Sequence, residues 1–114
     1  METYSIELTG TTTWNPLAQR EARFTRFILR ADGFFFEFAY ERSHYSGIFQ
    51  RKQEDYFSGT FEARGDGGRR SGSGTCRLGQ SGDGFELRGE WYEKEEGESV
   101  ERHYPDWYAE LYRP

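Results

Sequence analysis

The sequence predicts an all-β protein, a single up-and-down antiparallel β-barrel of about eight strands. Three observations support this prediction. Apolar and polar residues alternate with a period of two, and turn-forming residues recur about every ten to twelve positions. A third observation is that no long amphipathic helical pattern is present. The chain of 114 residues suits one domain, so we expect residues 1–114 to form the barrel alone.

The first half of the chain supplies four of the expected strands. The first covers residues 4–14, where apolar and polar positions alternate up to Trp14. A loop is expected at Asn15 and Pro16, because proline cannot donate to a β-ladder. Further strands are expected over residues 21–30, 34–40 and 45–51, with turns at 31–33 and 41–44.

The second half supplies the other four. Strands are expected over residues 56–63, 69–78, 85–91 and 99–104, with turns at 52–55, 65–68, 79–84 and 93–98. The strand over 69–78 has few apolar residues, which predicts an edge or a poorly closed seam. The segment after Pro105 is open to two structures: a strand over 107–112, which the alternation favours, or a short helix capped by Asp106.

Tight connections favour a closed barrel over the alternative, a two-sheet β-sandwich. A long meander removes its exposed edges by closing, whereas a sandwich usually needs long crossover connections. Two glycines, Gly59 and Gly89, fall on inward rows, where glycine indicates a bend or a close backbone approach. Their missing side chains also predict space for a cavity.

Composition limits the partners. A net charge of −5 argues against sequence-independent binding of nucleic acid and against anionic membrane surfaces. Cys76 is the single cysteine, so no intrachain disulfide can form. The first residues lack a signal-peptide pattern, and no apolar run reaches the length of a membrane helix. We therefore expect a soluble, cytoplasmic protein that binds neither nucleic acid nor membranes.

No constellation of residues predicts catalysis, a cofactor or a metal. The two histidines, His44 and His103, and the lone Cys76 show no ligand spacing that would bring them together. No nucleophile elbow is present, and the acidic residues 93–98 are expected to form a solvated hairpin tip. A non-catalytic protein is thus favoured over an enzyme.

Two segments carry a resemblance to a known group of barrels. Residues 8–15, Leu-Thr-Gly-Thr-Thr-Thr-Trp-Asn, resemble the opening strand of the calycins, meaning lipocalins, fatty-acid-binding proteins and avidins. Residues 56–62, Tyr-Phe-Ser-Gly-Thr-Phe-Glu, are similar to the Gly-Thr-aromatic strand of avidin-like proteins. The resemblance implies an aromatic-lined barrel that often holds a small ligand and frequently self-associates.

The inward rows predict a ligand site inside the barrel, lined by rings and one cation. The predicted site residues are Arg26, Phe36, Phe38, Tyr40, Phe61 and Trp91. Arg26 enters this site if Phe24 and Ile28 share its inward face; its guanidinium then suits an anionic group. If instead Phe27 and Leu29 face inward, Phe24 and Ile28 remain outside as an oligomer contact.

The leading hypothesis is therefore non-covalent binding of a small hydrophobic or aromatic ligand with an anionic end. The alternative is a protein-interaction, regulatory or inhibitor module that uses outer aromatic rows or acidic loops. A further expectation is self-association as a homodimer, because rings are favoured at protein interfaces. The rings expected on the outer faces are Phe35, Tyr56, Tyr92 and Tyr108.

Overall fold

The computed structural model describes residues 4–15, 20–66 and 68–114, with the side chains of Asn15 and Arg20 left out. These residues form nine strands and contain no helix. The strands are β1 (Ser5–Glu7), β2 (Thr9–Asn15), β3 (Arg20–Arg30), β4 (Gly33–Tyr40), β5 (Ser43–Arg51), β6 (Tyr56–Gly65), β7 (Gly68–Ser81), β8 (Gly84–Glu95) and β9 (Arg102–Tyr112). Most of the loop expected at Asn15 and Pro16 lies outside the described residues.

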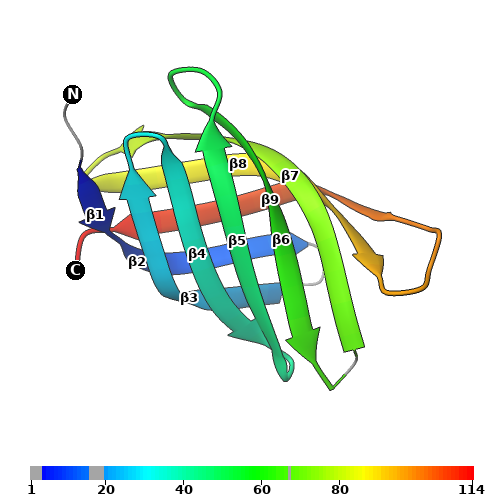
Figure 1. Cartoon of the computed structure of the whole chain (residues 1–114). Helices are drawn as coiled ribbons and strands as arrows, with labels where there is room; N and C mark the ends of the chain where they lie inside the picture. Colours follow the sequence, from blue (N-terminus) through cyan, green and yellow to red (C-terminus); the bar gives the residue numbers. More distant parts are fainter. Residues whose placement is uncertain (1–3, 16–19, 67) are drawn as a thin grey trace.

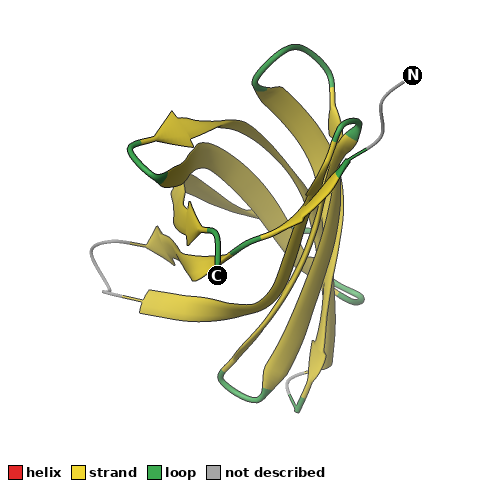
Figure 2. Cartoon of the chain, turned by 90° about the vertical axis from the view of Figure 1, so that its left-hand side faces the viewer, coloured by secondary structure: helices red, strands yellow, loops and turns green. Residues whose placement is uncertain are grey.

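The sheet closes on itself. Each strand from β2 to β8 pairs antiparallel with the next, and β9 pairs back onto β2 (Figure 1). The result is an eight-stranded up-and-down barrel, which confirms the predicted fold class and excludes the sandwich. Figure 2 shows these strands wrapping around one interior. The extra strand β1 pairs with β3, separated from β2 by Leu8, whose N–H donates to the Phe27 carbonyl at 2.9 Å.

Strand β3 changes its inward face half-way along. Its pairing with β4 shifts register between Phe24 and Arg26, so the residue between them is a β-bulge. Phe24 lies inward before the bulge, and Phe27 and Leu29 lie inward after it. The two faces predicted from alternation are therefore each right for half of the strand. Arg26 falls on the outside, which corrects its predicted place in the interior.

The last strand is longer than predicted at its C-terminal end. It begins at Arg102 rather than near residue 99, and it continues through Pro105 to Tyr112. The strand structure favoured after Pro105 is thus right, and the helix alternative is wrong. Pro105 is tolerated because the β8–β9 register shifts there, between the pairs Gly89–Trp107 and Trp91–Tyr104. A proline at such an irregularity has no ladder hydrogen bond to lose.

Strand β7 is neither an edge nor an open seam. It is the longest strand, at 14 residues, and pairs along its length with both β6 and β8. Backbone hydrogen bonds hold this ladder without requiring apolar side chains. Its inward glycines, Gly72 and Gly74, lie against the rings of Phe61 and Phe49 and the Cβ of Trp91.

Aromatic rings fill the middle of the barrel. Phe36 and Phe38 are 0 % exposed, and Phe36 packs its ring within 6.0 Å of the Phe49 and Trp107 ring centroids. The glycines make room for these rings rather than for a cavity. A Cβ at Gly59 would lie 2.7 Å from the Phe49 Cγ, so the space expected beside Gly59 is occupied. The prediction of an open, ring-lined interior is wrong for this part of the barrel.

Gly89 confirms the other expectation for the inward glycines, a close backbone approach. A Cβ at this position would lie 2.2 Å from the Thr75 carbonyl oxygen and 2.6 Å from the Cβ of Cys76. Only glycine fits at such a distance, because real side chains do not approach a carbonyl this closely. The neighbouring strands β7 and β8 are thereby drawn together beside the buried thiol of Cys76.

Candidate functional site

The predicted site residues do not come together around one cavity. Four of them are packed core: Phe36, Phe38, Phe61 and Trp91 are buried among other rings. Arg26 lies outside the barrel, where its guanidinium carbon is 5.7 Å from the centroid of the Phe35 ring. There it lines a separate hollow of about 370 Å³. Tyr40 is half-buried at the end of β4 and lines a cavity of the barrel.

This cavity, of about 230 Å³, opens where the ring core stops at one end of the barrel. In Figure 1 it is the end marked by the β4–β5 turn at the bottom and the long β8–β9 connection on the right. Ligand pockets for drug-sized molecules measure roughly 300–1,000 Å³, so this cavity suits a smaller molecule. The residues that line it are Trp14, Tyr40, Glu41, Ser43, Tyr45, Arg70, Glu93, Glu95, Arg102 and Tyr104.

Three polar side chains are packed at the inner side of the cavity. The Arg70 Nη2 donates to the Ser43 Oγ at 2.7 Å, and its Nη1 lies 3.9 Å from the Glu93 Oε2. The Arg70 guanidinium also lies over the Tyr45 ring, 5.3 Å from the ring centroid. Ser43 and Glu93 are each 5 % exposed. The guanidinium is thus held in place by three neighbours at the edge of the ring core.

Burial governs the ionisation of this cluster. It raises the pKa of Glu93, although Arg70 and Arg102 oppose the shift. It also raises the pKa of Tyr45 to about 12, and the negative charge of Glu93 adds to that rise. The cause is their low exposure, 4 % for Tyr45 and 5 % for Glu93, so little water reaches the inner side of the cavity.

Two buried donors at this end have no hydrogen-bond partner. They are Arg70 Nε and Trp91 Nε1, and no other buried side-chain nitrogen or oxygen in the described part of the chain is unpaired. The Trp91 ring packs 6.0 Å from Trp14 and 6.4 Å from Tyr45, measured between centroids, and both of these rings line the cavity. Buried polar groups are normally hydrogen-bonded, so these two donors are exceptions in the core; Arg70 lines the cavity, whereas Trp91 does not.

The turn at the rim of the cavity is strained. Glu41 and Arg42 have φ of 46° and 64°, the left-handed region, in the two-residue turn between Tyr40 and Ser43. Hairpin turns of this form prefer Asn-Gly, and a non-glycine residue there costs of order 1–3 kcal/mol. The strain places the Glu41 carboxylate at the rim, and such strain concentrates at functional sites.

Among the described side chains that line the cavity, carboxylates outnumber cations. Arg70 lies near Glu93, and the Arg102 Nη2 is 3.7 Å from the Glu95 Oε1. Within this described lining, Glu41 has no matching cation. The described lining therefore disfavours a ligand that carries a full negative charge.

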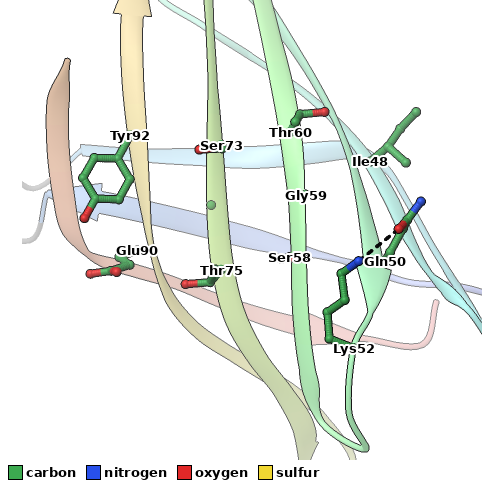
Figure 3. A pocket seen from close by; sticks show the side chains of 11 residues that line it. Ile48, Gln50, Lys52, Ser58, Gly59, Thr60, Ser73, Thr75, Glu90 and Tyr92 are labelled. Carbon is green, nitrogen blue, oxygen red and sulfur yellow. Dashed lines mark hydrogen bonds between the residues drawn. The ribbon is translucent and has the colours of Figure 1, made fainter. Parts of the chain in front are cut away.

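A second hollow lies on the outer wall, over β5 to β8, and measures about 590 Å³ (Figure 3). Its floor is made of short side chains on β6 and β7, such as Thr60 and Ser73, which are register partners. On one side Tyr92 stacks on His103, 4.4 Å between ring centroids, and the His103 Nε2 lies 3.0 Å from the Glu90 Oε2. None of the described residues that line this hollow has a buried polar atom without a partner. The cavity at the barrel end is the stronger candidate.

Arginine or histidine side chains lie against the outer rings predicted to form an interface. Each of the four rings has a cation or an imidazole against its face. The pairs are Arg26 with Phe35, Arg77 with Tyr56, Arg88 with Tyr108, and His103 with Tyr92.

The sequence interpretation missed Ser43, Tyr45, Arg70 and Glu93 as site residues. Glu93 was placed in a solvated turn, and Arg70 in a strand thought to be poorly packed. The signal was nevertheless present, because Glu93 continues the inward row of Leu87, Gly89 and Trp91 by one more step of two residues. Extending the inward rows past the expected turns would have found both charges.

Other kinds of site have little support. Among the described residues, no group of three or more His, Cys, Asp or Glu side chains could hold a metal ion. None of the described residues belongs to a helix that is long and apolar enough to cross a membrane. Cys76 is a free thiol in the core, and burial raises its pKa. The chain matches no protein-family model, no curated protein and no solved structure.

Proposed function

We propose that the protein binds a small organic molecule, without covalent chemistry, in the cavity at the β4–β5 end of the barrel. The observation that carries this proposal is the arrangement of Arg70. Its guanidinium is fixed by Ser43, Tyr45 and Glu93, and the side chain, 20 % exposed, lines a cavity of aromatic and charged residues. A ligand acceptor could receive a hydrogen bond from the accessible part of this guanidinium.

The aromatic wall supports a flat ligand. Trp14 and Tyr40 meet edge to face, with centroids 4.9 Å apart, and Tyr104 lines the cavity beside them. The ring core below them closes the floor, so the ligand occupies one end of the barrel and does not enter its middle. This form of site agrees with the calycin resemblance, in which a meander barrel holds a small ligand.

The test compares two neighbouring arginines. Arg70→Met removes the guanidinium at the cavity, whereas Arg69→Met changes an exposed side chain on the same strand. Saturation-transfer NMR with a panel of small aromatic molecules should detect binding to the wild type and to Arg69→Met, and a loss of at least tenfold in affinity for Arg70→Met. An equal response in the two variants would remove Arg70 from the site.

Native mass spectrometry of freshly purified protein adds a second test. A carried small molecule should appear as a mass increment that Arg70→Met lacks.

We further propose a cytosolic location for this activity, which the free, buried thiol of Cys76 supports.

A homodimer remains a prediction, with a changed contact surface. Ile48 is the exposed residue of an outer apolar strip: it is 62 % exposed, whereas its neighbour Phe35 lies under Arg26 and Ile28 on the next strand is 5 % exposed. This apolar strip would also serve the alternative function, a protein-interaction module. Sedimentation should show a dimer at micromolar concentration that Ile48→Glu dissociates and Gln50→Glu, on the same strand face, does not. A wild-type monomer would overturn the dimer.

A further inference from the structure

We propose that the ligand is an uncharged, flat molecule that presents a carbonyl oxygen and an N–H side by side, as a primary amide, a lactam or a nucleobase edge does. This inference rests on the proposed binding function and specifies its ligand. It is carried by a donor and an acceptor that stand next to each other at the inner side of the cavity, Arg70 and Glu93.

The donor side is Arg70. A guanidinium offers five N–H groups and no acceptor. One of its nitrogens donates to Ser43 and another lies 3.9 Å from Glu93, and 20 % of the side-chain surface stays exposed where Arg70 lines the cavity. A ligand that meets this guanidinium must supply an acceptor, and a carbonyl oxygen is an acceptor that carries no charge.

The acceptor side is Glu93. Its Oε2 is 3.9 Å from the Arg70 Nη1, which is too long for a direct hydrogen bond. An ionised carboxylate has about four lone-pair sites, so acceptor capacity remains even where Tyr45 donates to it. A ligand N–H placed beside the carbonyl oxygen would use this capacity while the carbonyl faces Arg70.

Charge excludes the two ionised alternatives. A carboxylate ligand would suit Arg70, but it would lie against the buried Glu93 and near Glu41 and Glu95. An amidinium ligand would suit the carboxylates, but it would lie against the Arg70 guanidinium. In either case a buried charge faces a like charge with little water to screen it, which is strongly unfavourable. A neutral amide edge satisfies both partners and adds no charge.

The experiment uses three probes of the same shape: benzamide, benzoate and benzamidine. Benzamide offers an acceptor and a donor, benzoate only acceptors, and benzamidine only donors. Binding is measured by NMR titration of the wild type at pH 7.5, with the Trp14 indole signal as the reporter of the cavity wall. We expect benzamide to bind at least tenfold more tightly than either of the ionised probes.

The variant Glu93→Gln tests the acceptor directly. It removes one negative charge, so benzoate should gain about tenfold relative to benzamide. The matched control is Glu90→Gln on the outer face of the same strand, which should keep the wild-type order. The order of the three probes in the wild type needs no variant, so the proposal stays testable if Glu93→Gln fails to fold.

The outcomes separate the two proposals. Benzoate or benzamidine binding as tightly as benzamide, with the Trp14 signal shifting, would overturn the ligand class and leave the binding function in place. No binding of any probe at millimolar concentration would overturn the binding function itself, and the ligand class with it.

Discussion

The Trp107 Nε1 donates a hydrogen bond of 2.9 Å to the Thr12 Oγ1, across the seam where β9 closes onto β2. The Thr12 hydroxyl in turn donates to the Tyr108 carbonyl, also at 2.9 Å. Thr12 is 0 % exposed and Trp107 is 1 % exposed. Two buried hydrogen bonds therefore join the first strand of the barrel, β2, to its last strand, β9.

Thr12→Val should destabilise the barrel by about 1–3 kcal/mol. Valine keeps the shape of threonine but leaves the Trp107 Nε1 buried without a partner. The free-energy cost of removing this N–H from water is then no longer offset by a hydrogen bond. Urea unfolding measures the change. Thr13→Val, at the next position and on the opposite strand face, should stay within about 0.5 kcal/mol. Equal effects at the two positions would show that the Trp107 hydrogen bond adds nothing to stability.

Gly47→Ala should destabilise the protein by about 1–3 kcal/mol, because the barrel has no space for one more methyl group there. The new Cβ would lie 2.4 Å from the Phe36 Cζ, and Phe36 is locked among other rings. Gly79→Ala is the matched control, since nothing lies within 4 Å of its Cβ position. If Gly47→Ala left the thermal unfolding unchanged, the Phe36 ring would be able to move and make room for the methyl group.

The period-two pattern predicted most of the fold because each inward row packs into the one core. It failed where the backbone departs from strict alternation. The bulge in β3, between Phe24 and Arg26, carries neither glycine nor proline to mark it. The continuation of β9 through Pro105 depends on an irregular register with β8, and pairing partners cannot be seen in one strand's sequence.

The candidate site was less predictable than the fold. Tyr40 was found because it ends a clear inward row. Arg70 and Glu93 were missed because charged residues near expected turns are usually solvated. Their burial follows from the length of β7 and β8, which extend the ladder beyond the last apolar residues. Arg26 was misplaced because one bulge moved it from the predicted interior to the outer face.

Trp91→Ala should lower the free energy of unfolding by about 3–5 kcal/mol, as expected for a large ring lost from a packed core. Trp91 is 1 % exposed and stacks on Phe61 and Trp107, with centroids 4.6 and 5.1 Å away. Val100→Ala, in the exposed β8–β9 connection, should change stability by less than about 0.5 kcal/mol. A loss below about 1 kcal/mol at Trp91 would contradict its place in the core.

Tyr45 should make the protein sensitive to alkaline pH. Burial raises its pKa from 10.0 to about 12, so the folded state holds the phenol proton more tightly than the unfolded state. This stabilisation is complete below pH 10 and is lost as pH rises to about 12, a change of about 3 kcal/mol. Urea unfolding of the wild type should show this additional loss relative to Tyr45→Phe. Parallel pH profiles for the two proteins would contradict it.

The variant Glu93→Gln should change the way in which the free energy of unfolding depends on pH on the acid side. Burial raises the pKa of Glu93 in the folded state, although Arg70 and Arg102 oppose the shift, while Glu95 adds to it and a hydrogen bond from Tyr45 reduces it. The folded state therefore binds the Glu93 proton more tightly than the unfolded state. Its contribution to stability is present below the usual value of 4.5 and is lost as pH rises through the raised pKa.

Glutamine has no such proton, so the variant should gain stability relative to the wild type between pH 4 and pH 8. The hydrogen bond from Tyr45 can remain, because the amide keeps an acceptor oxygen. Urea unfolding at the two pH values measures the difference. Glu62→Gln, an exposed carboxylate on β6, serves as the control and should follow the wild type at both pH values. A Glu93→Gln variant that loses stability relative to the wild type as pH rises would show that the ionised Glu93–Arg70 pair outweighs the desolvation of the carboxylate.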